Sequence, residues 1–250
     1  MPRKPNINII EIGTPGWKKA LPVVQFVDNK NILVDENLIT IANTKNDPWN
    51  YEVHEQYLTN KWILKDDIVL ELGSRLGIVS LTINSRLENK QNHIVIEPNK
   101  QVIKALKYNR KSFNAKFKIC SKVISNKPLK YITLNNGLGN YTVNQDTIID
   151  SDNMIEHEIK TISSSDFCNK YTLNYTVLVA DCEGCLCTFL NENSYLFEKL
   201  ELIIFERDNT EICNYKIVFG LLKDNGFSFR DGLINNSDNP ELYFQQVWSK

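Results

Sequence analysis

The sequence lacks any long hydrophobic run. No apolar stretch approaches the roughly 20 residues that a membrane-spanning helix needs, so we expect no contact with a membrane. The basic first five residues are not followed by an unbroken apolar segment, and we therefore expect no secretory signal. An excess of charge is also missing: 29 basic and 30 acidic residues give a net charge of −1. This balance argues against a nucleic-acid partner, which would favour a basic surface.

Two nucleotide-binding motifs are absent from the glycine-containing segment at residues 68–77. Arg75 stands where the dinucleotide fingerprint requires glycine, and no Gly-Lys-Ser/Thr follows, as a phosphate-binding loop would require. What the segment contains is a short apolar strand, residues 68–72, then a turn and a helix. Gly73 and Gly77 allow a tight turn and the close approach of a ligand, because neither has a Cβ atom. Glu71 lies near the carboxyl end of the strand, where open α/β sheets bind ligands.

The six cysteines offer two interpretations. Cys182 and Cys185 have C-x-x-C spacing and Cys187 follows, which is compatible with a metal or redox site. The alternative is small buried residues around a strand-to-helix turn. We favour the second, because no further C-x-x-C or nearby Cys/His pair completes a zinc site. Free cysteines without a signal predict a reducing, cytoplasmic compartment.

The order of apolar segments predicts the fold class. A chain of 250 residues with 42% hydrophobic residues can bury a substantial core. Alternating strands and helices favour a doubly wound α/β sheet that is mostly parallel, with helices on both faces. Strands are expected at residues 68–72, 93–97, 116–121, 175–180 and 200–205, helices at 51–64, 78–87, 100–111, 185–191 and 210–225, and a closing antiparallel hairpin at 227–230 and 242–247.

The hydrophobic pattern is weaker in the remaining segments. Residues 1–50, with possible strands at 23–27 and 32–41, are expected to form an extension that caps a core domain at 51–250. Residues 131–134 and 140–143 read as extra strands, followed by a polar loop or flap at 144–153. Asn99 and Ser163 are each placed to cap the helix that follows.

A carboxylate ends the second expected strand. Glu97 is followed by Pro98, and it lies about 20 residues beyond the glycine turn. In nucleoside-binding sheets a carboxylate at this point accepts hydrogen bonds from both ribose hydroxyls. Further along, the strand at residues 175–180 leads directly into Asp181 and Glu183. Because the carboxyl ends of parallel strands meet at one edge, these residues are expected near the glycine turn.

Taken in order, these motifs resemble the FkbM-type S-adenosylmethionine (SAM)-dependent methyltransferases. The similarity covers roughly residues 52–230 and joins the glycine turn, the acidic-Pro pair, Asp-x-Glu-Gly and a strand ending in Glu206. It implies a Rossmann-like class I methyltransferase fold, SAM as cofactor with S-adenosylhomocysteine as product, and O-methylation of a sugar, glycan or related small molecule. The oligomeric state stays open.

The resemblance also implies roles for single residues. The methionine end of SAM would be lined by Glu71, Gly73, Ser74, Arg75 and Gly77. Glu97 would hold the ribose, and Ser121 would lie beside the adenine. Asp181 would face the sulfonium and the acceptor, with Glu183 nearby, and one of the two would act as the catalytic base.

The chain departs from the family pattern at several positions. Ser74 and Arg75 replace the usual Ala-Asn that follows the first glycine, and Arg75 is expected to pair with the SAM carboxylate or an acidic neighbour. Val179 stands where the family often has lysine, and Leu186 where it often has an acid. These changes leave room for a catalytically inactive binding protein on the same fold.

A metal-dependent mechanism is a further alternative. In catechol O-methyltransferase-like enzymes, residues at such strand ends hold Mg²⁺, and Asp181, Asp208 and Asn209 fall at the ends of two strands. Three oxygen ligands and waters would suit that ion. We favour the simpler interpretation, in which Asp208 and Asn209 cap the next helix and there is no metal.

Overall fold

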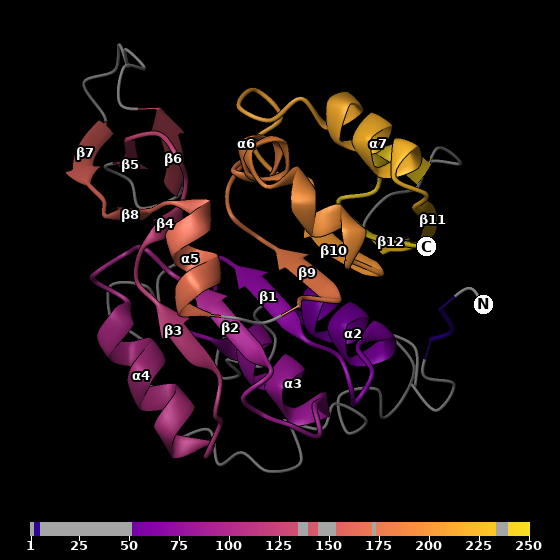
Figure 1. Cartoon of the computed structure of the whole chain (residues 1–250). Coiled ribbons are helices and arrows are strands. Elements are labelled where there is room, and N and C mark those ends of the chain that lie inside the picture. Colours follow the sequence, from indigo (N-terminus) through magenta and orange to yellow (C-terminus); the bar gives the residue numbers. More distant parts are fainter. Residues whose placement is uncertain (1–2, 6–51, 135–139, 145–153, 172–173, 234–239) are drawn as a thin grey trace.

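The computed structural model describes residues 3–5, 52–134, 140–144, 154–171, 174–233 and 240–250. Its central feature is a sheet of seven strands (Figure 1). Their bounds are β1 Val69–Leu72, β2 His93–Ile96, β3 Lys118–Cys120, β9 Val177–Ala180, β10 Leu202–Glu206, β11 Ser228–Leu233 and β12 Gln245–Ser249. The order across the sheet is β11-β12-β10-β9-β1-β2-β3.

All pairs from β3 to β10 are parallel, and β12 pairs antiparallel with both β10 and β11. The predicted Rossmann-like α/β class with a C-terminal antiparallel hairpin is therefore confirmed. The chain moves outward from β1 through β2 to β3, then returns to place β9 on the other side of β1. This reversal is a topological switch point, where open α/β sheets bind their ligands.

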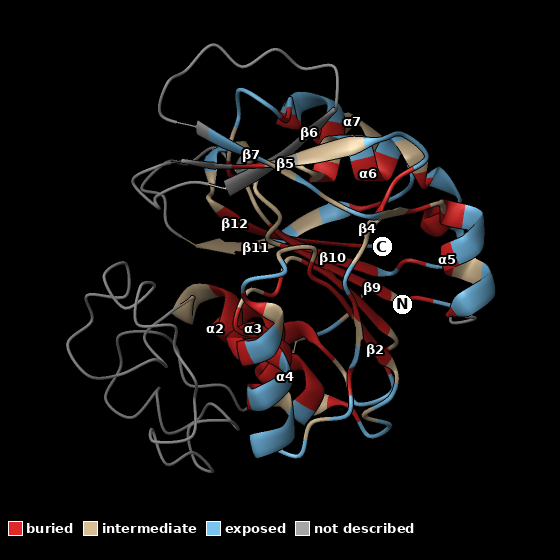
Figure 2. Ribbon diagram, turned by 90° about the vertical axis from the view of Figure 1, so that its left-hand side faces the viewer, coloured by how far each residue is buried: buried red, intermediate tan, exposed pale blue. Residues whose placement is uncertain are grey.

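Helices cover both faces of the sheet (Figure 2). One layer contains α2 Val53–Trp62, α3 Ile78–Arg86 and α4 Ile103–Ser112, and the other contains α5 Ser164–Lys170, α6 Leu186–Glu192 and α7 Tyr215–Asp224. Alternate residues of a strand pack against the two helix layers, because successive side chains point to opposite faces of the sheet. In β9, Val177 and Val179 pack with α2 and α3, whereas Leu178 and Ala180 pack with the other layer.

A smaller sheet follows β3 and stands apart from the main sheet, at the upper left of Figure 1. Its strands are β5 Leu129–Leu134, β6 Asn140–Asn144 and β7 Met154–Glu158, all antiparallel. The predicted extra strands are thus confirmed, and β4 Val123–Ile124 with β8 Thr161–Ile162 forms a short parallel pair beside them. The described residues also include the 3₁₀ helices η4 Ser194–Glu198 and η5 Pro240–Leu242.

Two helix starts differ from the prediction. α7 begins at Tyr215 rather than near residue 210, because Asn214 caps it by accepting from the Lys216 N–H. Asn99 does not cap α4, which begins later, at Ile103; its side chain accepts from the Gln101 N–H instead. Ser163 caps α5 as predicted. The strands expected at 23–27 and 32–41, and the flap beyond residue 144, lie outside the described residues.

Candidate functional site

The turn after β1 and the end of β9 touch at the switch point. The Asp181 N–H donates to the Leu72 carbonyl over 3.0 Å. Gly73 has a φ of 78°, and a Cβ atom built on it would lie 1.7 Å from the Asp181 carbonyl oxygen. Only glycine fits there, since it accepts a positive φ and has no Cβ. The structure therefore brings together two predicted site segments that are about 108 residues apart.

The turn from Gly73 to Gly77 is held in an unusual backbone conformation. Arg75 has a φ of 47° and Gly77 a φ of 83°, and Gly77 precedes the first residue of α3. Ser74 is 6% exposed, and its Oγ atom has no hydrogen-bond partner within the described part of the chain. A buried hydroxyl without a partner is rare in folded proteins. Ser74 Oγ is thus positioned to bond a ligand that occupies the turn.

Glu97 joins the end of β2 to this turn. Its Oε2 atom accepts from the Ser74 N–H at 3.2 Å and the Arg75 N–H at 2.7 Å, and its Oε1 atom accepts from the Asn99 N–H at 2.8 Å. Burial raises the pKa of Glu97, and these backbone bonds and Arg75 oppose the shift. Each carboxylate oxygen accepts about two hydrogen bonds. Oε1 therefore keeps capacity for one more donor, as a ribose hydroxyl would provide.

Glu71 requires a correction. The prediction places it against a cofactor, but its side chain is 1% exposed. Its Oε1 atom accepts from Ser80 Oγ and its Oε2 atom contacts His93 Nε2, both at 2.8 Å. Both oxygens are thus engaged inside the interface between the sheet and α3. We revise the role of Glu71 from a cofactor contact to a buried group that ties β1 to α3 and β2.

Ser121 follows β3 and is exposed, one residue beyond the Cys120 carbonyl that accepts from the Glu97 N–H. It therefore lies at the same edge of the sheet as Glu97. Nothing in the described contacts tests its expected position beside an adenine, which stays a prediction.

A row of polar side chains crosses the carboxyl edge on the α2 side of the sheet. Val179 pairs with Ile204 and Glu206 pairs with Gln245, so Asp181, Glu206 and Gln245 follow one another on three adjacent strands. Glu55 in α2 covers this row: one oxygen each of Glu55, Asp181 and Glu206 lies within 4.8 Å of the other two. The sequence pattern does not predict Glu55 or Gln245 as site residues, and it predicts Glu206 only as the end of a strand.

Mutual repulsion perturbs these carboxylates. Burial, followed by the charges of Glu206 and Asp208, raises the pKa of Asp181 well above its usual range, while Arg75 lowers it. Burial and Asp181 likewise raise the pKa of Glu55, and burial with Asp208 raises that of Glu206 to about 8. A raised pKa suits a carboxyl to acid–base chemistry, because proton transfer is most efficient when the pKa is near the working pH.

Glu183 lies on the strained loop after Asp181, with a φ of 56°. Its Oε2 atom accepts from Asn209 Nδ2 at 2.5 Å, and burial, then Asp208, raises its pKa. Asp208 Oδ1 accepts from the Gly184 N–H and the Tyr215 hydroxyl. Asp208 and Asn209 therefore hold this loop in place. The expectation that they cap α7 is wrong, because Asn214 caps that helix. Their role as Mg²⁺ ligands together with Asp181 stays a prediction.

The expectation of free cysteines is wrong for four of the six. Cys182 bonds Cys185 across Glu183 and Gly184, and Cys187 in α6 bonds Cys213 just before α7. Cys120 and Cys168 are free. The spacing did not reveal the second pair, whose members are 26 residues apart. The prediction of a reducing compartment was based on free cysteines, so these two disulfides remove its support.

None of the helices in the described ranges combines the length and apolar character needed to cross a bilayer.

Comparison with known proteins gives fold neighbours alone. No family model and no curated protein matches the sequence. Among solved structures, the chain is similar to a precorrin-6y C5,15-methyltransferase from Geobacter metallireducens (11% identity, 90% of this chain and 96% of that one, TM-score 0.48). It is also similar to an O-methyltransferase from Bacillus cereus in complex with SAH (10% identity, 90% of this chain and 95% of that one, TM-score 0.48). A candidate RNA methyltransferase from Pyrococcus horikoshii has 14% identity over 93% and 96%, with a TM-score of 0.47. Likeness at this level leaves the function to be argued from the site.

Proposed function

We propose that this protein is a SAM-dependent methyltransferase that methylates a hydroxyl group of a sugar, glycan or related small molecule. The observation that carries the proposal is the glycine turn itself. Ser74 Oγ is buried there without a partner, and Glu97, which is bonded to the same turn, retains one acceptor position. The resemblance to the FkbM-type family supports the choice of SAM and of a hydroxyl acceptor.

The residues present fit this cofactor. Glu97 would accept from a ribose hydroxyl, and Ser74 would bond the amino-acid end of the ligand. Asp181 lies beside the turn, and a sulfonium cation bound there would favour its ionised form. SAM when bound supplies an electrophilic methyl group. Arg75, whose charge acts on Asp181, Glu183 and Glu97, prevents the edge from being uniformly acidic.

Asp181 is the proposed general base. It lies at the end of β9 in direct contact with the glycine turn, and its raised pKa makes its carboxylate a stronger base. It would accept the proton of the acceptor hydroxyl as the oxygen attacks. Glu183 is held by Asn209 on the next loop, so we assign it to positioning the acceptor. The rest of the acceleration would come from holding the two reactants in line.

The proposal is tested by titration calorimetry of the full chain with SAM and with S-adenosylhomocysteine. We expect binding in the wild type and about fivefold to tenfold weaker binding in Ser74→Ala, the loss of about one hydrogen bond. Because Ser74 Oγ has no protein partner, this variant should fold as stably as the wild type. Glu88→Gln, which changes an exposed carboxylate, is the control.

The outcomes separate the alternatives. If neither ligand binds to the wild type, the SAM assignment is wrong. If both bind but no acceptor is methylated by the wild type in a screen of sugars and glycans, the catalytically inactive binding protein becomes the better description. Turnover that Asp181→Asn retains in full would remove Asp181 from the role of base.

A further inference from the structure

We propose that the carboxyl edge binds one hard divalent cation, of the Mg²⁺, Mn²⁺ or Ca²⁺ type, between Glu55, Asp181 and Glu206, with Gln245 beside them. This goes beyond the proposed function, and its test uses no SAM, so each proposal can fail without the other. The ligand set differs from the alternative considered from the sequence. It draws on α2 and β12, which that alternative did not involve.

The strand register explains why these oxygens converge. Asp181 follows β9, Glu206 ends β10 and Gln245 begins β12, and the pairing places them in one row on the same face. That face is covered by α2, which contributes Glu55, a residue only 2% exposed. Three carboxylates from three elements therefore meet at one point of the edge, and the Gln245 amide lies beside Glu206.

The spacing of the carboxylates fits one ion. Their nearest oxygens lie within 4.8 Å of one another. Two oxygens on opposite sides of one Mg²⁺ are about 4.2 Å apart, and on opposite sides of Ca²⁺ about 4.6–5.2 Å, from the usual metal–oxygen distances. The set contains no histidine or cysteine, which favours hard cations over zinc or copper.

A second observation points to a ligand that the protein itself does not supply. Gln245 is 5% exposed, and its amide group lies against Glu206, with Nε2 to Oε2 at 3.2 Å. Its Oε1 atom is buried and has no hydrogen-bond partner among the described residues. Asp208 beside the row likewise has a buried Oδ2 atom without a partner in that part of the chain. Buried oxygens without donors are costly unless a cation or donor satisfies them.

The charge balance points in the same direction. Three acidic side chains, Glu55, Asp181 and Glu206, place an oxygen each within 4.8 Å of the other two, so their ionised forms repel one another. A divalent cation at the centre of the row would turn this repulsion into attraction, and it would lower the pKa of a hydroxyl that coordinates it.

The test is titration of the full chain with MnCl₂ in the absence of SAM, followed by calorimetry and by loss of the free Mn²⁺ resonance signal. We expect one ion per chain. Glu55→Gln should weaken binding at least tenfold, and Gln245→Ala about threefold or more. Glu88→Gln, an exposed carboxylate outside the row, should bind as the wild type does.

Stability measurements accompany the titration. Glu55→Gln removes a repelled charge, so it should fold at least as stably as the wild type, and weaker Mn²⁺ binding cannot then be assigned to unfolding. Absence of Mn²⁺ uptake by the wild type overturns the proposal. So does uptake that Glu55→Gln and Gln245→Ala both leave unchanged, because the ion would then be bound elsewhere.

Discussion

Gly73 is the residue on which the contact between the two site segments depends. Replacing it with alanine adds a Cβ atom 1.7 Å from the Asp181 carbonyl oxygen and forces a side chain onto a φ of 78°. The strain alone costs about 1–2 kcal/mol. The clash must be relieved by moving β1 and β9 apart. We expect Gly73→Ala to lose more than about 3 kcal/mol of unfolding free energy, or to fail to fold, as measured by urea denaturation.

Gly226 provides the matched control. Its φ is 83°, but a Cβ atom there would meet nothing within 4 Å. Gly226→Ala should therefore lose only the backbone strain, about 1–2 kcal/mol. Equal losses in the two variants would show that the contact with Asp181 is unimportant.

Glu206 makes the stability of the protein depend on pH. Burial and Asp208 raise its pKa from 4.5 to about 8, so the folded state holds a proton that the unfolded state releases above about pH 4.5. The stabilisation is present in full below pH 4.5 and is lost as the pH rises to about 8. We expect the unfolding free energy to fall over this window, on the order of a few kcal/mol.

Glu206→Gln identifies the source of this slope. The variant cannot titrate at this position, so its unfolding free energy should fall less steeply between pH 4.5 and 8. Glu55 and Asp181 have shifts of the same sign, so part of the slope should remain. Denaturation curves at several pH values give the comparison. The same slope in both proteins would assign the effect to other groups.

At the scale of elements, the disulfide between Cys187 and Cys213 joins α6 to the segment before α7. It closes a loop of 26 residues, for which chain entropy predicts about 3.5 kcal/mol of stabilisation. Cys187→Ser with Cys213→Ser should lower the unfolding free energy by roughly this amount, measured by urea denaturation without reductant. Adding dithiothreitol should lower the wild type toward the variant; a wild type insensitive to reductant would contradict this.

The sequence predicts elements better than it predicts contacts between them. The buried parallel strands are continuous apolar runs, so β1, β2, β9 and β10 were found within two residues of their bounds. The site residues in the turns could be placed as well, because they directly follow the ends of these strands. Glu55 could not be predicted, because the hydrophobic pattern of a helix identifies the apolar residues of its inner face and not a carboxylate among them. Glu71 was misassigned because the motif does not show which face of the strand it occupies, and here that face is closed by Ser80 and His93.

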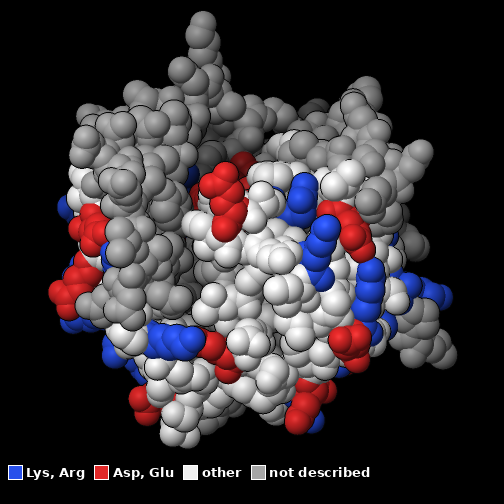
Figure 3. All heavy atoms as spheres, turned by 90° about the horizontal axis from the view of Figure 1, so that it is seen from above, with Lys and Arg blue, Asp and Glu red and all other residues white. Residues whose placement is uncertain are grey.

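At the scale of the whole molecule, charge is mixed over the surface. On the face shown in Figure 3, basic and acidic side chains of the described residues alternate rather than form one stripe. This mixture agrees with the balanced composition. Acidic groups are concentrated instead at the carboxyl edge, in the row of Glu55, Asp181 and Glu206. Such a row destabilises the fold, as expected where a site is kept for function.

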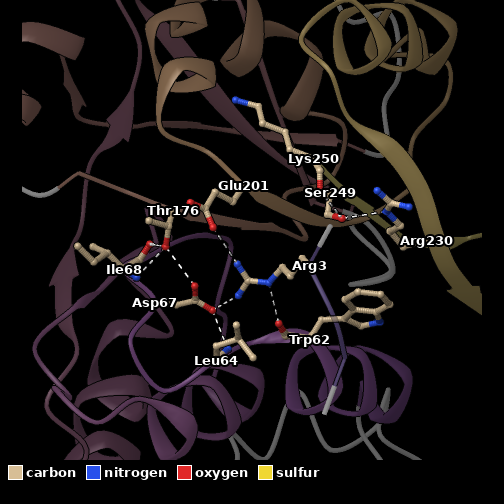
Figure 4. A network of polar contacts seen from close by, with 10 residues as sticks. All are labelled: Arg3, Trp62, Leu64, Asp67, Ile68, Thr176, Glu201, Arg230, Ser249 and Lys250. Atoms are coloured by element: carbon tan, nitrogen blue, oxygen red, sulfur yellow. Dashed lines mark hydrogen bonds and ion pairs between the residues drawn. The ribbon is translucent and has the colours of Figure 1, made fainter. Parts of the chain in front are cut away.

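The opposite, amino edge of the sheet holds the two described ends of the chain together (Figure 4). The guanidinium of Arg3 forms a buried ion pair with Asp67, just before β1, and its Nε donates to the Trp62 carbonyl over 3.2 Å. Glu201 lies 3.8 Å from Arg3 and accepts from the Lys250 N–H through its carbonyl. Arg3 therefore ties the first described residues to the sheet and, through Glu201, to the last residue.

Arg3→Ala should separate stability from function. It leaves Asp67, which is 6% exposed at its side chain, as a buried charge without its partner, and removal of one member of such a pair costs about 3–5 kcal/mol. Lys4→Ala, at the exposed neighbour, should cost almost nothing. Since β1 spans about 13 Å from this edge to the glycine turn, SAM affinity of folded Arg3→Ala should equal that of the wild type in calorimetry. A variant as stable as Lys4→Ala would show that Arg3 does not anchor the chain. One that is destabilised and also loses SAM affinity would show that the two edges of the sheet are coupled.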